Sequence, residues 1–485
     1  MNYRMVVFVL GRIFLVEAAM LLLPMTCSAI YGEWYMLPAF LLPAVILLLL
    51  GLAASLRTPK NTTIYARDGL AIVALVWVLM SAFGALPFVI SGEIPAFADA
   101  FFEMVSGFTT TGSTILNDVE ALSRGALFWR SFSHWVGGMG VLVFAMAVLP
   151  MTDGRAMHLM RAEVPGPTCG KLSSKLSDSA KILYGIYFAM TALEVVFLCA
   201  GGMSLYESLI HSFGTAGTGG FSNRGLSIGA YQNPYFEWVI GIFMLLFGVN
   251  FNLYYFILMR HFREAFGSEE LRAYLGIVLF STVTIAANIL SMVGSVGEAV
   301  RTAFFQVSSI ITTTGYATAD FNLWPTYSRI LLLVLMFVGG CAGSTAGGLK
   351  MSRVIIFFKA ARQDLNKMLH THAVTTIRFE GKPLDEKTLQ GVHNYFNVYM
   401  LLIMLSTVLV SLDGFDLTTT FTAVITCINN VGPGMEMVGP MGNFSRFSAP
   451  VKYLLSFDML AGRLELYPML AMFAPRLWRS RRTMR

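Results

Sequence analysis

The hydrophobic residues of this chain run in long stretches rather than alternating with polar residues. A helix needs about 20 apolar residues to cross the hydrocarbon core of a membrane. The stretches that meet this length without Asp, Glu, Lys or Arg are 34–56, 69–92, 131–152, 238–259, 273–297, 330–349 and 388–412. The stretches 5–31, 182–206 and 453–475 meet it with a few charges inside. The pattern therefore predicts an all-α membrane protein of ten spans.

Composition supports the membrane and excludes the other classes of protein. The chain has 485 residues, of which 56% are hydrophobic and only 13% are charged, whereas a soluble protein carries about 25% charged residues. So few charged side chains cannot cover the three or so soluble domains that this length would otherwise suggest. The five cysteines show neither metal-ligand spacing nor a disulfide framework.

The distribution of Lys and Arg predicts which side of the membrane each loop faces. With the N-terminus in the cytoplasm and alternating spans, most of the 34 basic residues fall in cytoplasmic loops, as the positive-inside rule requires. The outer side holds only Arg124, Arg130, Arg224, Arg301, Arg329, Arg446 and Lys452. We therefore expect a multi-pass protein of the cell inner membrane with both termini in the cytoplasm, in contact with lipid and without a nucleic-acid partner.

Four outer loops each carry a short, semi-apolar segment followed by a run rich in Thr and Gly. The runs are TTTGST at 109–114, GTAGTGGF at 214–221, TTTGYAT at 312–318 and INNVGPGME at 428–436. They recur about every 100 residues with two spans per period, which indicates an internal repeat. The alignment places Gly112, Gly219, Gly315 and Gly432 at equivalent positions.

The short segments cannot span the membrane, so they enter it partway and turn back. Such backbone is tolerated only where it is buried in protein or lines a watery cavity. Glycine permits the positive φ that aims successive carbonyl groups in one direction. Four such runs around one axis form rings of carbonyl oxygens, which can replace the hydration shell of a cation such as K⁺. One Thr-Gly pair alone would indicate close helix packing; four copies at one period favour a pore.

These runs, together with GGCAGSTAGGLK at 339–350 and GRLELYP at 462–468, resemble the superfamily of K⁺ transporters that includes the Trk, Ktr and plant HKT proteins. The resemblance covers essentially the whole chain, and TrkH/TrkG-type members are the nearer match because they add two helices in front. It implies four tandem helix–pore loop–helix repeats around one central pore. The implied units are 1–60 (two N-terminal helices), 61–155, 156–265, 266–370 (with a broken second helix) and 371–485 (with a basic tail).

The resemblance implies that the four runs form a K⁺ selectivity filter. Family members that prefer Na⁺ have Ser in place of the first glycine, and all four positions are Gly here, so we expect K⁺ as the transported ion, with Rb⁺ also permeant. The expected filter residues are Thr110, Thr111, Gly112, Gly217, Thr218, Gly219, Thr313, Thr314, Gly315, Asn430, Val431 and Gly432. The fourth run departs from the others at Val431 and Pro433, so the ring is not four-fold symmetric and its selectivity is looser.

The run at 339–350 lies inside a predicted span and has small residues on all faces. Each Gly costs a helix interior about 1 kcal/mol relative to Ala, so we expect a break; close packing through small residues is the alternative. Leu349 stands where a nucleotide-binding P-loop requires Lys, so no nucleotide binds to this chain there. The resemblance implies an intramembrane gate below the filter, made of Gly339, Gly340, Gly343, Ser344, Thr345, Gly347, Gly348, Lys350 and Arg463.

Arg463 is a charge at bilayer depth, which costs about 2.5–3.5 kcal/mol or more. It should therefore face a cavity or a partner. One interpretation is a structural ion pair with Glu465 or Asp458; the other, implied by the resemblance, is a pore-facing barrier to cations. Glu103 and Glu207 either anchor the pore helices or lie at a watery mouth.

Partners follow from the resemblance alone. It implies a homodimer and a cytosolic, nucleotide-binding regulatory subunit of TrkA type that docks on the basic segments 350–387 and 476–485. Two other functions stay open at this stage. A secondary transporter coupled to H⁺ or Na⁺ would use Glu17 or Glu194, although the repeats share one orientation, whereas many carriers have inverted halves. An enzyme is not expected, because no nucleophile–base pair lies within a span.

Overall fold

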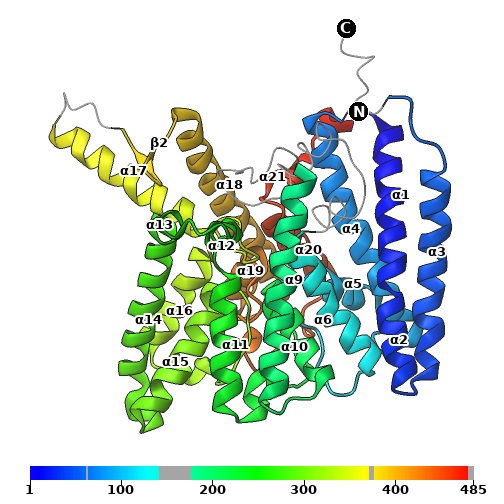
Figure 1. The fold of residues 1–485 in the computed structure, drawn as a ribbon, viewed down its shortest axis with the longest axis horizontal. Coiled ribbons are helices and arrows are strands. Elements are labelled where there is room, and N and C mark those ends of the chain that lie inside the picture. The colour runs from blue at the N-terminus through cyan, green and yellow to red at the C-terminus, as the bar shows by residue number, and fades with distance from the viewer. Residues whose placement is uncertain (62–63, 141–175, 371–375, 479–485) are drawn as a thin grey trace.

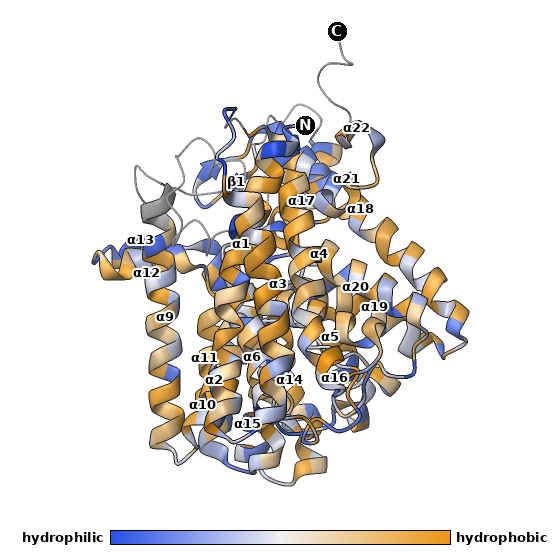
Figure 2. Ribbon diagram, turned by 90° about the vertical axis from the view of Figure 1, so that its right-hand side faces the viewer, coloured by the Kyte–Doolittle hydropathy of each residue, from blue (hydrophilic) through white to orange (hydrophobic). Residues whose placement is uncertain are grey.

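The structure, a computed structural model, describes residues 1–61, 64–140, 176–370 and 376–478. This part of the chain is almost entirely helical (Figure 1). Its strands are the short antiparallel pair β1 (Arg378–Phe379) and β2 (Lys382–Pro383). Apolar residues cover most of the long helices, and polar residues gather at their two ends (Figure 2). This distribution is the one expected for helices that cross a bilayer.

Two helices precede the repeats and lie together at one edge of the molecule (Figure 1). The first span, Tyr3–Ile30, consists of α1 (Tyr3–Met20) and α2 (Leu22–Ile30), and α3 (Leu37–Ser55) returns beside it after the 3₁₀ turn η1 (Trp34–Met36). A Cβ added at Gly51 would lie 2.8 Å from the carbonyl oxygen of Gly11. The pair is therefore packed through small residues, as is common between helices in lipid.

Four repeats follow, each built from a long helix, a short helix, an extended run and a second helix. The long first helices are α4 (Ala66–Ser91), α9 (Leu176–Ala200), α14 (Glu269–Val293) and α18 (Glu386–Val410). The short helices, here called pore helices, are α5 (Phe97–Phe108), α10 (Leu205–Gly217), α15 (Val296–Ile311) and α19 (Leu417–Asn429). The second helices are α6 (Arg124–Gly138), α11 (Pro234–Phe247), α16 (Thr326–Val338) and α20 (Ala449–Arg463). The predicted architecture of two helices and four repeats is confirmed.

The second helices are shorter than the apolar stretches predict. Two of the expected straight spans are wrong in detail, and the third interruption is the break predicted at 339–350. The stretch 238–259 bends by 92° between α11 and α12 (Phe251–Leu258). The stretch 330–349 is helical only as far as Val338, and 453–475 is interrupted after Arg463 before α21 (Tyr467–Ala471). Hydrophobicity alone does not reveal the bend after Phe247 or the interruption after Arg463, because both lie in stretches that are apolar overall.

Connecting elements lie at the end of the bundle opposite the pore helices (Figure 1). They are α13 (Phe262–Gly267), α17 (Met351–Leu369), the β1–β2 hairpin, α21 and α22 (Pro475–Trp478). The N-terminus lies at the same end (Figure 1). Helix α17 leads away from the body of the molecule and returns through the hairpin to α18. The remaining 3₁₀ turns are η2 (Ser227–Tyr231), η3 (Phe321–Leu323), η4 (Ser411–Asp413) and η5 (Glu436–Val438).

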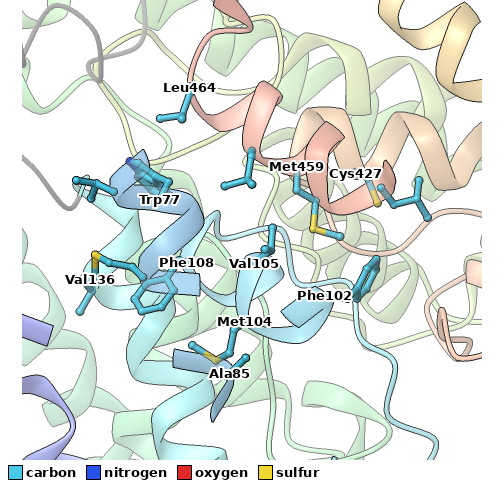
Figure 3. Close-up of a cluster of buried hydrophobic side chains, with 14 of the residues drawn as sticks. Trp77, Ala85, Phe102, Met104, Val105, Phe108, Val136, Cys427, Met459 and Leu464 are labelled. Carbon is cyan, nitrogen blue, oxygen red and sulfur yellow. The ribbon is translucent and has the colours of Figure 1, made fainter. Parts of the chain in front are cut away.

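The largest hydrophobic cluster joins the N-terminal pair to the first and fourth repeats. Figure 3 shows Trp77 of α4, Phe102 and Phe108 of α5, and Met459 of α20 around one interior. The first and fourth repeats are therefore neighbours although the whole chain separates them. This packing closes the four repeats into a ring and holds the pore helices rigidly.

Candidate ion pathway

The four Thr-Gly runs adopt one backbone conformation. Each run contains a non-glycine residue with φ of 55° or 56°; these residues are Thr110, Thr218, Thr313 and Asn430. A glycine with positive φ follows two positions later in every run; the four glycines are Gly112, Gly220, Gly315 and Gly432. Left-handed conformation is tolerated by Gly and costly for other residues, so its repetition at the same spacing defines the alignment of the repeats.

The alignment from the sequence is therefore one residue out in the second repeat. Gly220, and not Gly219, is the counterpart of Gly112, while Gly219 corresponds to Thr111. Gly217, one of the predicted filter residues, is the last residue of α10. The sequence offers two consecutive glycines in TGGF, and without the backbone angles nothing distinguishes them.

Hydrogen bonds at the ends of the pore helices give the same alignment independently. The amide of Thr111 donates to the carbonyl of Ser106 at 2.9 Å, five residues earlier. The equivalent five-residue bonds run from Gly219 to Gly214, from Thr314 to Ser309 and from Val431 to Thr426, at 2.8, 2.8 and 2.9 Å. Each bond ends its helix by satisfying an orphan carbonyl. The chain then leaves in extended form toward the end of the bundle opposite the connecting elements, here called the outer end.

The four runs meet edge to edge in chain order. A Cβ added at Gly112 would lie 2.0 Å from the carbonyl oxygen of Gly219 in the next repeat. The same contacts join Gly220 to the Thr314 oxygen at 2.0 Å, Gly315 to the Val431 oxygen at 2.3 Å, and Gly432 back to the Thr111 oxygen at 2.8 Å. The contacts return to the first repeat, so four carbonyl oxygens form one closed ring. No side chain larger than hydrogen fits at the four glycines.

The partial negative charges of these four carbonyl oxygens are not balanced by a hydrogen-bond donor in the described part of the chain. Among the described residues, no hydrogen bond reaches the oxygens of Thr111, Gly219, Thr314 or Val431, and all four residues are buried. A buried carbonyl without a partner is costly, and four together repel one another. A desolvated cation held between them would satisfy all four, which is the coordination seen in K⁺ filters.

Side-chain and backbone contacts tie each run to its neighbour. Ser113 donates to the carbonyl of Gly432 at 3.0 Å, which joins the first run to the fourth. Tyr316 donates to the carbonyl of Phe221 at 3.2 Å, which joins the third run to the second. Asn322 accepts from the amide of Glu436 at 3.0 Å, beyond the third and fourth runs. The ring is therefore held from outside, and the ring carbonyls stay available for a ligand.

A buried ion pair joins the first and second runs at the outer mouth. Glu103 of α5 accepts from Arg130 Nε at 2.5 Å and from the amide of Ile115 at 2.9 Å. The guanidinium of Arg130 also donates to the carbonyl of Ser222 at 3.1 Å and lies over the ring of Phe221. Of the two interpretations of Glu103, the geometry favours the structural anchor.

The outer mouth is a cavity of about 120 Å³ that all four glycines of the ring line. Its charged lining residues are Arg130 and Arg224, and each is paired with a carboxylate. Arg224 lies 2.8 Å from Glu207. Burial raises the pKa of Glu207, but the hydrogen bonds from Arg224 and Asn223 outweigh it and lower the pKa below its ordinary value. The pairing cancels the positive charges that would otherwise repel a cation at this mouth.

The glycine-rich stretch 339–350 is a non-helical loop directly below the ring. The amide of Gly347 donates to Thr313 Oγ1 at 2.6 Å, and the amide of Gly348 donates to the carbonyl of Asn429 at 3.0 Å. The loop is thus bonded to the base of the third and fourth runs. The break predicted from the five glycines is present, and packing of a continuous helix is excluded.

The loop is also tied to the bend in the second repeat. The amide of Cys341 donates to the carbonyl of Gly248 at 2.9 Å, and the amide of Phe251 donates to the carbonyl of Gly343 at 3.0 Å. Thr345 Oγ1 donates to the carbonyl of Phe247 at 3.2 Å. The end of α11 thus turns away to make room for the loop, which explains the 92° bend.

Arg463 and Lys350 supply positive charge to the same region. Arg463 donates to the carbonyl of Thr345 at 2.8 Å and to the carbonyls of Gly137 and Gly138, each at 2.5 Å. It therefore bridges the loop to the end of α6. Lys350 is 2% exposed, and its ammonium donates to the carbonyl of Ala346.

The structural ion pair considered for Arg463 is not what the structure shows. Glu465 pairs with Arg353, and Asp458 accepts from Ser406 Oγ at 2.9 Å. The two acids next to Arg463 in the sequence thus have other partners. The position of Arg463 below the ring follows instead from its bonds to the loop.

Two buried histidines and two buried glutamates lie outside the ring and the loop. His134 contacts the carbonyl of Gly107 at 2.7 Å, and His211 contacts the hydroxyl of Tyr231 at 3.0 Å, so both act in packing. Glu17 lies in α1, which packs against α3 and α4, and Glu194 lies in α9, which packs against α10. Neither carboxylate belongs to the ring or the loop. In the described residues no group of three His, Cys, Asp or Glu side chains could hold a metal ion.

Comparison with known proteins points to one family. The family model TrkH, described as a cation transport protein, matches residues 37–480. The chain is 37% identical to the Trk system potassium uptake protein TrkH of Escherichia coli (strain K12), over 86% of each chain. It is 34% identical to the Trk system potassium uptake protein TrkG of the same strain, over 99% of each chain. All of these relatives are transporters, not enzymes.

A solved structure has the same fold. The crystal structure of the potassium transporter TrkH from Vibrio parahaemolyticus superposes with a TM-score of 0.88 at 30% sequence identity. The match covers 99% of this chain and 100% of the other. The similarity therefore extends over the N-terminal pair and all four repeats.

Proposed function

This chain belongs to the TrkH family of cation transport proteins, and from that premise we propose that it is a K⁺-selective, Rb⁺-permeant ion-translocating subunit for potassium uptake. The observation that carries the proposal is the closed ring of four buried carbonyl oxygens, to which none of the described residues donates a hydrogen bond. Ions enter from the outer mouth and pass one at a time through the ring of oxygens. The relatives are potassium uptake proteins by name, which supports the choice of ion.

In this proposal, loop 339–350 and Arg463 form the gate. The loop is bonded to Thr313 at the base of the ring, so an ion leaving the ring inward meets backbone and not water. The guanidinium of Arg463 adds a fixed positive charge on the same side, and the buried Lys350 side chain is bonded to the carbonyl of Ala346 in the loop. Conduction requires the loop to move aside.

The membrane potential drives the flux. An inside-negative potential supplies about 2.3 kcal/mol per charge per 100 mV, so an open pore accumulates K⁺ without ATP. For uptake in this direction, the pore mouth faces the outside of the inner membrane and both termini lie in the cytoplasm. The relatives are named as parts of a Trk system, which supports a further component. We propose that the chain works as a homodimer with a TrkA-type regulatory subunit at the basic segments 350–387 and 476–485, of which 371–375 and 479–485 lie outside the described residues.

A bi-ionic flux assay in proteoliposomes tests the filter. K⁺ or Rb⁺ flux is measured against Na⁺ flux for the unchanged chain and for Gly112→Ser. We expect Gly112→Ser to abolish the preference for K⁺, because its Cβ would lie 2.0 Å from the Gly219 oxygen. Gly225→Ser is the matched control, because a Cβ at Gly225 has nothing within 4 Å.

Two results would contradict the proposal. Flux that is indifferent to Gly112→Ser would remove the ring as the selective element. Uptake in a fixed ratio with H⁺ or Na⁺, lost on Glu194→Gln or Glu17→Gln, would instead establish a coupled secondary transporter.

A further inference from the structure

Glu270, the second residue of α14, lies beneath the gate loop and grips it at two points. Its Oε1 accepts from the amide of Ala342 at 2.8 Å and from the amide of Ser352 at 2.9 Å. Ala342 is near the start of the loop, and Ser352 is the second residue of α17, just beyond the loop's end. One carboxylate oxygen therefore closes the loop at its base.

The two hydrogen bonds are of the strong kind. Each of them joins a backbone amide to a carboxyl oxygen that water hardly reaches, because Glu270 is only 4% exposed, and a hydrogen bond in the protein interior is electrostatically stronger than one in water. The amide of Ser352 is one of the orphan donors of the first turn of α17, whose N-cap residue, Lys350, makes no side-chain capping bond. A carboxylate there also meets the positive end of the helix dipole. Removing it would leave two buried amides without partners.

The hairpin beyond α17 is bonded to the residues that carry this carboxylate. Glu380, an exposed residue of the hairpin, accepts from Ser268 Oγ at 2.8 Å and from the amide of Glu270 at 3.0 Å. Lys359 of α17 lies 2.5 Å from Glu269 and donates to the carbonyl of Arg378 at 2.7 Å. The start of α14 is therefore fixed by α17 and the hairpin together.

We propose that Glu270 is a positioning residue that latches the gate loop shut, and that Glu380 couples this latch to the hairpin outside the membrane. Displacement of the hairpin moves the start of α14, draws the carboxylate from Ala342 and Ser352, and frees the loop. The proposal rests on the gating role proposed above for the loop. It adds the route by which an event at the cytoplasmic surface reaches the pore.

Rb⁺ flux into K⁺-loaded proteoliposomes, without any regulatory subunit, tests the latch. We expect Glu270→Ala to raise this basal flux about tenfold, since losing two buried hydrogen bonds of the shut state shifts the equilibrium by that order. Glu270→Gln keeps an acceptor oxygen without the charge, so its rise is smaller. Glu380→Ala raises flux by about threefold, because it loosens α14 and leaves the carboxylate in place.

The K⁺ over Na⁺ ratio separates the latch from the filter. It stays unchanged in all three variants, because none touches the ring. The matched control is Glu264→Gln, an exposed glutamate of α13 with no bond to the loop, and its flux equals that of the unchanged chain. Should Glu270→Ala not fold, Glu270→Gln and Glu380→Ala carry the test.

Modification of Cys341 provides a readout that does not depend on flux. This residue of the loop is buried and free, so in a chain with Cys341 as its one cysteine, a water-soluble thiol reagent reacts slowly. We expect Glu270→Gln to speed the reaction several-fold. Unchanged flux and unchanged modification in folded Glu270 variants would overturn the latch, while the Gly112→Ser result would still decide the filter separately.

Discussion

The ring and the gate loop are both glycine-rich, buried and non-helical, yet they differ in whether their backbone carbonyl groups accept hydrogen bonds. In the ring, the oxygens of Thr111 and its three counterparts receive no hydrogen bond from the described residues. In the loop, the oxygens of Gly343, Thr345 and Ala346 each accept one from a residue outside or at the end of the loop. In our proposal, similar composition thus gives an ion-binding element in one place and a gate in the other.

The difference shows what decides the role of a buried glycine run. The ring is made of four equivalent runs, so its oxygens face one another. Because all four oxygens are hydrogen-bond acceptors, a cation is the ligand that would satisfy them together. The loop exists once, and every neighbouring repeat can supply it with donors and acceptors. Unmet polar groups thus indicate a binding site, whereas satisfied ones indicate a structure that is stable in one state until its partners are withdrawn.

The largest effect is expected from a change in the ring itself. Gly220→Ser places a Cβ 2.0 Å from the Thr314 oxygen at a φ of +74°. Left-handed backbone alone costs an L-residue about 1–2 kcal/mol, and the clash adds to it. We expect K⁺ flux to fall by tenfold or more, to about the level of Gly112→Ser, and the preference for K⁺ over Na⁺ to be lost, as measured by bi-ionic flux in liposomes.

This variant also tests the alignment of the second repeat. Gly220→Ser should behave like Gly112→Ser, because the two glycines are equivalent in the ring, and Gly225→Ser should have no effect. If Gly220→Ser retained full selectivity, the ring derived from the backbone angles would be wrong.

The next effect belongs to the gate. Arg463→Gln removes the donors to Thr345, Gly137 and Gly138 and a fixed positive charge below the ring. We expect Rb⁺ flux without a regulatory subunit to rise about tenfold, with the preference for K⁺ over Na⁺ unchanged. Arg463→Lys keeps the charge and cannot reach three carbonyls, so comparing the two variants separates the charge from the bonds.

A fall in flux for both Arg463 variants would contradict this view. It would mean that the guanidinium helps ions through the pore, and that the loop is held shut by other residues.

Much of the fold follows from the sequence because it depends on patterns that repeat. Ten apolar stretches and four Thr-Gly runs suffice for the architecture, and the break at 339–350 follows from its glycines. The bend after Phe247 does not, because Gly248 and Asn250 lie in a stretch as hydrophobic as a straight span. Its cause is the loop of another repeat, which sequence reasoning cannot place beside it.

The candidate site shows the same limit. The twelve predicted filter residues lie in or next to the four runs, but two adjacent glycines in TGGF leave the alignment undetermined until the φ angles are known. Glu270 carries no sequence signal, because an acidic residue at the start of a helix is common. Its role depends on Ala342 and Ser352, more than 70 residues away.

The smallest effect in this series is expected at Thr313, which allows a direct comparison of ring and loop because this residue lies in a run of the ring and is bonded to the loop. Thr313 and Thr110 occupy equivalent places in the ring, with φ of 56° in each. Thr313 Oγ1 accepts from Gly347 of the loop, whereas Thr110 Oγ1 donates to the carbonyl of Thr109 in its own run.

Replacing either threonine by Val keeps the shape of the side chain and removes the hydroxyl. Only Thr313→Val unlinks the loop, so we expect it to raise basal Rb⁺ flux about fivefold, whereas Thr110→Val leaves basal flux within about twofold. Any effect that both variants share comes from the ring, and the difference between them measures the bond to the loop. Equal flux in the two variants would show that the loop does not depend on this bond to stay under the ring.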